Sequence, residues 1–197
     1  LDVKRQESQK EKTSTIDVYA DVKNVIPILE EVVLSGAIVE FSSNSSSGYG
    51  YSKSYNSFTE EKRQRQKKII GNKGEQLVYN LLSNDTKIKK VRAVSEAFVA
   101  LGILSAGQAD STKGYDIEYE DESGDLYYVE VKSGSSNTFT MSPKELEFAK
   151  KNADKYELYL VYEIDEKTPK ATKLPNRFWE LEDYKMNEII EKIEVRF

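Results

Sequence analysis

The sequence contains no cysteine and no histidine in its 197 residues. Without them the chain cannot form a disulfide bond, a cysteine nucleophile, a serine–histidine triad or a zinc site with sulfur or imidazole ligands. Carboxylate, lysine and hydroxyl groups remain for any chemistry. Because carboxylate and carbonyl oxygens favour hard cations, we expect a metal bound by this chain to be Mg²⁺ or Mn²⁺.

Long apolar runs are absent too. The longest stretch without a charged residue, Ala97–Ala109, is too short to span a bilayer, and the charged first residues are unlike a signal peptide. We therefore expect a cytoplasmic protein. Because the chain starts at Leu1 rather than at methionine, we also expect it to be part of a longer polypeptide.

The composition is that of a globular protein, with 38% hydrophobic residues, 32% charged residues and a net charge of -5. The length allows one well-buried domain and some appendages. An acidic total disfavours nucleic-acid binding over the whole surface, so any such contact needs a local basic cluster.

The beginning of the chain is predicted to form a separate N-terminal segment, residues 1–41, which is a tail or the end of a preceding domain. It is expected to hold a helix over Ile28–Ser35 and a strand over Ala37–Phe41. Residues 42–57 are rich in Ser, Gly and Tyr, which predicts a flexible linker. The tyrosines at 49, 51 and 55 offer the alternative of stacking on bases.

A helix is predicted to start at Ser57, which has capping-box spacing to Glu60. Its first turns carry a basic run, and a solvated helix face and a phosphate-binding surface both explain it. The run consists of Lys62, Arg63, Arg65, Lys67 and Lys68.

Apolar residues at three- and four-residue spacing then mark a buried stripe, from Ile70 to Leu82, and Gly74 lies on it. Glycine in a helix interior costs about 1 kcal/mol relative to alanine. We therefore expect a close approach of this helix to a sheet at Gly74.

The most informative stretch is Gly114–Ser133, which is predicted to form a β-hairpin. Alternation places Asp116 and Glu118 on one face of its first strand, and Tyr115, Ile117 and Tyr119 on the other.

The loop length decides which residues face each other across this hairpin. A three-residue loop, Glu122–Gly124, with a left-handed glycine would place Asp116 opposite Glu130. A two-residue loop would pair Asp116 with Val131 and separate the acids. We predict the first.

The hairpin brings like charges together, since Glu130 shares a face with Lys132 and faces Asp116 in this register. Opposed like charges destabilise a strand pair unless a cation lies between them, so a metal site is one interpretation. The other is an exposed polar face stabilised by cross-strand pairing with Lys132.

The C-terminal third begins with a strong helix start, in which Ser142 is the N-cap, Pro143 follows and Glu145 stands at the third helical position. Capping explains Glu145 more simply than catalysis does. The remaining pattern predicts a strand inside the sheet, a loop, a last helix and a closing strand. These cover Glu157–Ile164, Thr168–Pro175, Met186–Ile193 and Glu194–Phe197.

Asp116 followed by Glu130-Val131-Lys132 resembles the Asp…Glu-x-Lys signature of the PD-(D/E)XK, or restriction-endonuclease-like, nuclease superfamily. More of the chain, about Ile69 to Ile164, resembles the NO VEIN C-terminal domain family of that superfamily. Members often end larger ATPase, helicase or defence-related polypeptides. The segments that carry this resemblance are Gly71–Glu75, Gly114–Ile117, Val129–Ser133, Phe139–Leu146 and Tyr156–Val161.

The resemblance implies an α/β sandwich with a central mixed sheet flanked by helices, formed by residues 58–197 as a nuclease-like domain. It implies that Asp116, Glu130 and the main-chain carbonyl of Val131 hold Mg²⁺ (or Mn²⁺). Lys132 would orient or deprotonate the attacking water, and Glu75 would be the acid of the first helix. Two further roles are implied, a phosphate-contacting or supporting hydroxyl on Ser133 and phosphate contacts from the basic run.

These roles lead to the expectation of a metal-dependent endonuclease domain that acts on DNA, as the effector part of a larger defence or restriction protein. Expected partners are DNA and other domains or subunits, with a homodimer left open. The alternative is a catalytically inactive nuclease-fold module for nucleic-acid binding or partner docking. A small carboxylate-metal phosphatase has little support beyond the ligand types.

Overall fold

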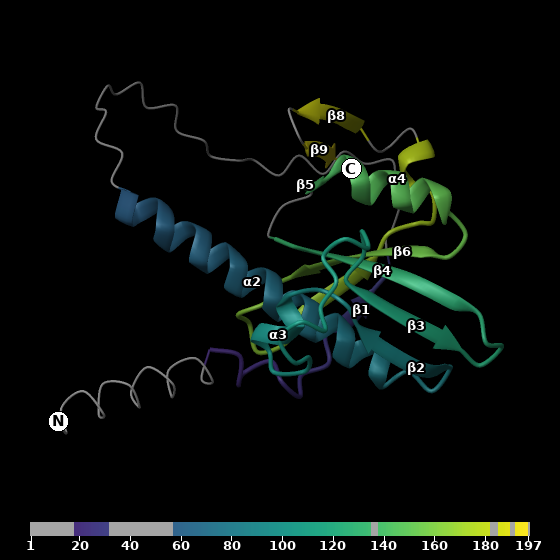
Figure 1. Ribbon diagram of the computed structural model, residues 1–197, viewed down its shortest axis with the longest axis horizontal. Helices are drawn as coiled ribbons and strands as arrows, with labels where there is room; N and C mark the ends of the chain where they lie inside the picture. Colours follow the sequence, from purple (N-terminus) through teal and green to yellow (C-terminus); the bar gives the residue numbers. More distant parts are fainter. Residues whose placement is uncertain (1–17, 32–56, 135–137, 182–184, 190–191, 197) are drawn as a thin grey trace.

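The computed structural model describes residues 18–31, 57–134, 138–181, 185–189 and 192–196 (Figure 1). The predicted linker and the predicted strand over Ala37–Phe41 therefore lie outside the described residues. The elements in chain order are β1 (Ile28–Glu30), α2 (Ser57–Ser83), β2 (Ile88–Ala93), α3 (Ala97–Ala100), β3 (Ile117–Asp121), β4 (Leu126–Ser133), β5 (Thr138–Met141), α4 (Pro143–Lys151), β6 (Tyr156–Tyr162), β7 (Lys170–Lys173), the 3₁₀ turn η1 (Phe178–Glu180), β8 (Lys185–Ile189) and β9 (Lys192–Arg196).

Six strands form one mixed sheet in the order β1-β7-β6-β4-β3-β2. The pairs β4–β6 and β1–β7 are parallel and the other neighbours antiparallel. Helix α2 packs on one face of this sheet and α4 on the other (Figure 1). This confirms the predicted α/β sandwich with a central mixed sheet. No helix in the described ranges is long and apolar enough to cross a membrane.

The two faces of the sheet carry separate cores, as the alternation along the strands requires. On the first face, Leu77 and Val78 of α2 pack against Ile117, Val129 and Val161. The second face is covered by α4, whose Leu146 and Ala149 are buried with Tyr156 and Leu158 of β6. Strand β6 lies between β4 and β7, which confirms its predicted place inside the sheet.

Gly74 is the point where α2 comes closest to the sheet. A Cβ atom added there would lie 1.9 Å from the Ser133 hydroxyl oxygen at the end of β4. Only glycine fits at this distance, so the predicted reason for a helix-interior glycine is confirmed. Helix α2 also runs without a break to Ser83, and Leu77, Val78 and Leu82 of the predicted stripe are buried.

The described part of the N-terminal segment, residues 18–31, packs on the same body. Val22 is buried, and the Asn80 amide of α2 donates to the Val22 and Val25 carbonyls at 3.0 and 2.8 Å. Lys73 of α2 forms an ion pair with Asp21 at 2.7 Å. Strand β1 completes this attachment by joining the edge of the six-stranded sheet.

Two predictions about the far edge of the sheet were wrong. Ile28–Glu30 forms a strand parallel to β7 rather than the start of a helix, and Lys170–Lys173 forms a strand where a loop was expected. The physical reason is shared. Each of these short strands takes its hydrogen bonds from a partner strand, and a local pattern does not contain that partner.

The predicted last helix was also wrong. Lys185–Ile189 and Lys192–Arg196 form an antiparallel hairpin, and β9 pairs with β5 to make a three-stranded sheet. The apolar spacing of Met186, Ile189 and Ile193 suits a helix, but isoleucine-rich segments favour strands when a partner is available. The strand predicted over Glu194–Phe197 agrees with β9 as far as Arg196.

Candidate active site

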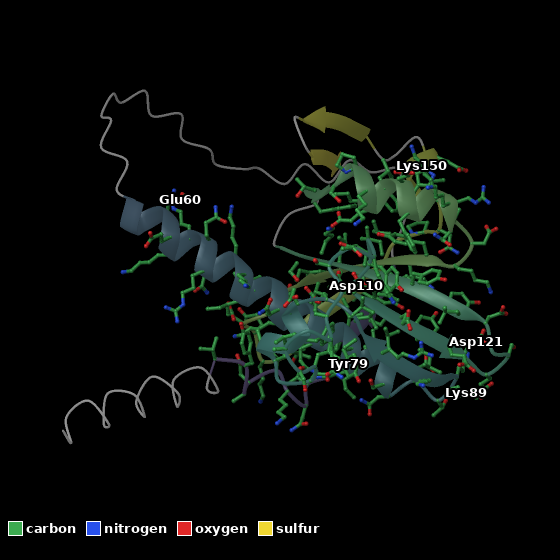
Figure 2. All side chains as sticks on the ribbon, viewed as in Figure 1. Glu60, Tyr79, Lys89, Asp110, Asp121 and Lys150 are labelled. Carbon is green, nitrogen blue, oxygen red and sulfur yellow. The ribbon has the colours of Figure 1, made fainter. Side chains whose placement is uncertain are left out.

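The β3–β4 hairpin has the predicted register over its described ladder, in which Ile117 pairs with Val129 and Glu120 with Leu126. The Asp121 N–H donates to the Asp125 carbonyl at 3.0 Å and closes a three-residue loop. Gly124 in that loop has φ +85°, the left-handed conformation expected of it. Asp121 marks the hairpin tip, far along the sheet from the free end of α2 (Figure 2).

The regular ladder ends at Ile117, so the predicted pairing of Asp116 with Glu130 is not part of it. The Asp116 N–H donates to the Val129 carbonyl at 2.8 Å, although Val129 is already the ladder partner of Ile117. Two residues of one strand thus oppose one residue of the other, which is a β-bulge. Bulges redirect side chains, and here Asp116 Oδ2 accepts a hydrogen bond from the Val131 N–H at 2.8 Å.

The bulge also corrects a predicted face. Tyr115 was grouped with Ile117, but its ring contacts Tyr128 and Phe148, with centroids 4.9 and 5.1 Å away, on the α4 side of the sheet. Ile117 is in the core beneath α2. The extra residue at Asp116 shifts the alternation by one, so residues before and after it change faces.

Glu130 and Lys132 lie on β4, on the face covered by α4. Glu130 is 3% exposed, and its Oε1 lies 2.6 Å from Lys132 Nζ. The same ammonium lies 3.1 Å from Glu145 Oε2, at the start of α4. Lys132 is therefore held between two carboxylates that come from a strand and a helix.

Glu145 has the predicted capping role and a contact that the sequence did not indicate. Its Oε2 accepts the Ser142 N–H at 2.7 Å, while its own N–H donates to Ser142 Oγ at 3.2 Å, which completes the capping box. The same Oε2 pairs with Lys132. The capping box fixes this carboxylate where α4 begins, and the fold places that helix start beside the end of β4.

Glu75 reaches the group from α2. Its carboxylate accepts a hydrogen bond from the hydroxyl of Ser95, a residue that follows β2. Burial raises the pKa of Glu75 from 4.5 to about 7; the Ser95 bond and the positive charge of Lys132 lower it, and the charge of Glu130 raises it. Glu75 is thus electrically coupled to Glu130 and Lys132 across the sheet.

Asp116 and Glu130 form a coupled acidic pair. Burial raises the pKa of both well above the ordinary carboxyl range. The charge of Glu75 adds to this for Asp116, and the charge of Asp116 adds to it for Glu130. Burial acts to lower the pKa of Lys132, but the surrounding carboxylates outweigh it and raise that pKa, so Lys132 stays an ammonium.

The donor set of this site fits a hard divalent cation. Glu130 supplies a buried carboxylate and Asp116 a half-buried one, and a cation bound by both would offset the like charges that act between them. The Val131 N–H points to Asp116, and the carbonyl of a strand residue faces the same edge as its N–H, so the Val131 carbonyl faces that side too. In the described part of the chain, no three acidic side chains are already arranged as a cation site.

The residues that were predicted to contact nucleic acid lie in two different surroundings. Ser133 Oγ is buried under Gly74, with no hydrogen-bond partner among the described residues, so the hydroxyl does not face the surface that a phosphate contact requires. The basic run is exposed along its whole length, on the half of α2 that projects beyond the sheet (Figure 1). Glu60, near the tip of this projection, is far from the sheet in Figure 2.

The structure therefore brings Glu75, Asp116, Glu130, Val131 and Lys132 together and leaves the basic run at a distance. Two residues near the group were missed by the sequence analysis, Ser95 and Tyr156. Ser95 lies two residues after the end of β2, and a hydroxyl close to a strand end is a weak signal of a site. Tyr156 opened a resembling segment but had no role assigned.

A sequence model of the family described as "Protein NO VEIN, C-terminal" matches residues 74–174, just over half of the chain. The chain belongs to this family. The match runs from the close approach of α2 at Gly74 through β7, so it extends about ten residues beyond the predicted limit at Ile164 and contains all the acidic site residues named above. Neither the curated proteins nor the solved structures gave a match to the chain.

Proposed function

We propose that this NO VEIN C-terminal domain is a metal-dependent endonuclease that hydrolyses phosphodiester bonds of DNA. We further propose that it belongs to the PD-(D/E)XK superfamily and serves as the effector part of a larger defence or restriction protein. The observation that carries the proposal is that Glu75 of α2, Asp116 just before β3, and Glu130 and Lys132 of β4 form one electrically coupled group.

In this proposal Asp116, Glu130 and the Val131 carbonyl would hold Mg²⁺, which when bound supplies Lewis acidity at the scissile phosphate. Lys132 keeps its proton because its pKa is raised. It therefore stabilises negative charge on the phosphate rather than removing a proton from water. Of the roles considered for Lys132, deprotonation of the attacking water is therefore not part of the proposal.

Glu75 is better suited to accept a proton from the attacking water. A general base works best when its pKa lies near the operating pH, and the pKa of Glu75 is about 7. The hydroxyl of Ser95 donates to one carboxylate oxygen and fixes the direction of the other. Glu75 thus acts as the base, and Ser95 positions it.

The projecting half of α2 supports the choice of nucleic acid as substrate. The exposed basic run ends at Lys68, which lies about two helical turns, or roughly 10 Å at 1.5 Å per residue, before Glu75. Phosphates on either side of a scissile bond lie within that reach. The positive charge on α2 offsets the acidic total of the chain at the place where a polyanion would lie.

One observation favours the inactive module as a second candidate. Lys132 Nζ already lies 2.6 Å from Glu130, so a cation would have to share this carboxylate with an ammonium. In an inactive module the ion pair between Lys132 and Glu130 would stabilise the fold, and the basic residues of α2 would bind nucleic acid or a partner.

The test is incubation of supercoiled DNA, linear DNA and RNA with the chain in Mg²⁺ or Mn²⁺. We expect metal-dependent DNA cleavage that is lost in Asp116→Ala and Lys132→Ala. Glu120→Gln is the matched control, because Glu120 lies on β3 but pairs at the surface with Lys89, and it should cleave normally. Absence of metal-dependent cleavage, or cleavage that survives both alanine variants, would sink the proposal.

A further inference from the structure

Tyr156, the first residue of β6, is 2% exposed, and its hydroxyl has no hydrogen-bond partner among the described residues. A buried hydroxyl without a partner costs free energy, so such groups are normally paired. The other buried tyrosines of the described chain follow that rule by donating to carboxylates: Tyr115 to Glu118 at 2.8 Å, and Tyr119 and Tyr159 to Glu157 at 3.0 and 3.4 Å.

The hydroxyl lies in the layer that holds the carboxylate site. Tyr156 pairs with Tyr128 on β4, and Glu130 is two residues further along that strand on the same face. The Tyr156 ring also packs beside Phe148 of α4, with ring centroids 6.2 Å apart. Tyr156 therefore stands between the sheet and α4, in the layer where Lys132 pairs with both Glu130 and Glu145.

The electrostatics of Tyr156 agree with this placement. Burial is the main cause that raises the pKa of Tyr156 well above its usual value, and the charges of Glu130, Glu145 and Asp116 add to it. The hydroxyl is therefore within electrostatic range of all three carboxylates without bonding to any of them.

Of the three carboxylates, Glu130 acts most strongly on the Tyr156 hydroxyl. Glu145 Oε2 already accepts from Ser142 and Lys132. Glu130 is paired with Lys132 through Oε1, and no donor within the described ranges reaches its second oxygen. Glu130 lies on the strand next to Tyr156 and on the same face of the sheet, so its second oxygen is the acceptor that we consider for the Tyr156 hydroxyl.

We propose that Tyr156 is a positioning residue of the carboxylate site, whose hydroxyl donates a hydrogen bond to Glu130 when that carboxylate turns from Lys132 toward a bound divalent cation. This inference rests on the proposed function, because it requires the cation. A ligand carboxylate that accepts a second hydrogen bond keeps its direction toward the metal. A hydrogen bond to Glu130 in the metal-bound state would offset the cost of burying the Tyr156 hydroxyl.

The experiment compares the full chain with its Tyr156→Phe variant by calorimetric titration with Mn²⁺ and by thermal unfolding in EDTA. We expect the Kd for Mn²⁺ to rise about tenfold, as for other lost partners of metal ligands. The unfolding midpoint in EDTA should stay the same or rise, because phenylalanine removes a hydroxyl that has no partner there. Tyr159→Phe, on the opposite face, should lower the midpoint and leave the Kd unchanged.

Two results would overturn the role of Tyr156 alone. One is a wild-type Kd for Mn²⁺ in Tyr156→Phe, and the other is a loss of stability in EDTA as large as that of Tyr159→Phe. Wild-type chain that binds no Mn²⁺ would instead overturn the proposed metal site, and this inference with it.

Discussion

Gly74 shows how much one residue controls in this molecule, because it sets the distance between α2 and the end of β4. A Cβ there would lie 1.9 Å from Ser133 Oγ and 3.2 Å from Ser133 Cβ. Alanine is the better helix former by about 1 kcal/mol, but overpacking of a core typically costs about 1–3 kcal/mol. We predict that Gly74→Ala lowers the free energy of unfolding, as measured by urea denaturation.

The double variant Gly74→Ala/Ser133→Ala separates the clash from other effects. It removes the hydroxyl that the new methyl group would strike, so we expect it to recover part of the lost stability. Ser133→Ala alone should be close to neutral, since this buried hydroxyl has no partner among the described residues. A Gly74→Ala variant as stable as the wild type would show that α2 can move away at no cost.

Glu75 leads to a pH prediction at the same scale. Burial raises its pKa to about 7, and only the carboxylate form accepts a proton. The cleavage rate should therefore rise as the pH increases through about 7. We predict that Glu75→Gln lowers the rate at pH 8 by about 100-fold and removes this inflection, as measured by initial rates of plasmid cleavage. An unchanged inflection in Glu75→Gln would assign the titration to another group.

Among the elements, α2 has two parts with different surroundings. Its C-terminal half is buried against the sheet, and its N-terminal half projects with its basic residues exposed (Figure 1). At about 100° per residue, Lys68 lies on nearly the same side of the helix as Glu75, whereas Arg63 lies about 120° away. If α2 carries DNA toward the site, Lys68 is the closer contact.

We predict that Lys68→Gln weakens DNA binding several-fold and lowers the salt dependence of log K by about one phosphate contact. Arg63→Gln is the matched control, because it also removes one positive charge from an exposed turn of α2. Arg63→Gln should change the affinity for DNA and the salt dependence of log K much less. Fluorescence anisotropy with labelled duplex DNA over a range of salt concentrations measures both. Equal losses in the two variants would indicate general charge attraction without a preferred face.

The elements that the sequence predicted well are those whose signals are local. The capping box at Ser142, the glycine of the hairpin loop and the buried stripe of α2 each lie within a few residues of the element they define. Strands β1 and β7 escaped prediction because each is short and depends on a partner far away in the chain. Strand β8 was mistaken for part of a helix although its partner β9 follows it directly, and only β9 pairs with a distant strand, β5.

In the candidate site, too, the residues with local signals could be predicted and those that depend on distant contacts could not. Asp116, Glu130 and Lys132 could be named from their spacing on a hairpin, since the turn fixes the register, whereas Glu75 was implied by the family resemblance. The bulge at Asp116 could not, because it depends on the Val129 carbonyl accepting from Asp116 while Val129 is the ladder partner of Ile117. Ser95, Tyr156 and the contact between Glu145 and Lys132 are tertiary, and no spacing in the sequence brings them together.

For the molecule as a whole, the buried acids link stability to pH and to cations. The carboxyl groups of Asp116, Glu130 and Glu75 have raised pKa values, so the folded chain holds their protons more tightly than the unfolded chain. Their contribution to stability is present at low pH and is lost as the pH rises above the ordinary carboxyl range, and for Glu75 this loss runs through about pH 7. Lys132 has no part in this window, because its pKa lies far above it.

A bound divalent cation would replace those protons, so we predict that Mg²⁺ raises the thermal midpoint more at pH 8 than at pH 5.5. The comparison of Mg²⁺ with EDTA at each pH cancels the titration of groups outside the site. Asp116→Asn should reduce the shift at pH 8. A Mg²⁺ effect that is absent at pH 8, or larger at pH 5.5, would contradict a metal site at these acids.

The central claim is that the gathered carboxylates and Lys132 cleave DNA with the help of a metal ion. Its most direct test is a Mg²⁺ titration of supercoiled plasmid cleavage by the wild type and by Lys132→Ala, with Mn²⁺ binding measured on both. We predict that both bind the metal and that only the wild type converts the plasmid to nicked and linear forms, an activity stopped by EDTA. A folded, metal-binding wild type that leaves the plasmid intact at every Mg²⁺ concentration would contradict the claim.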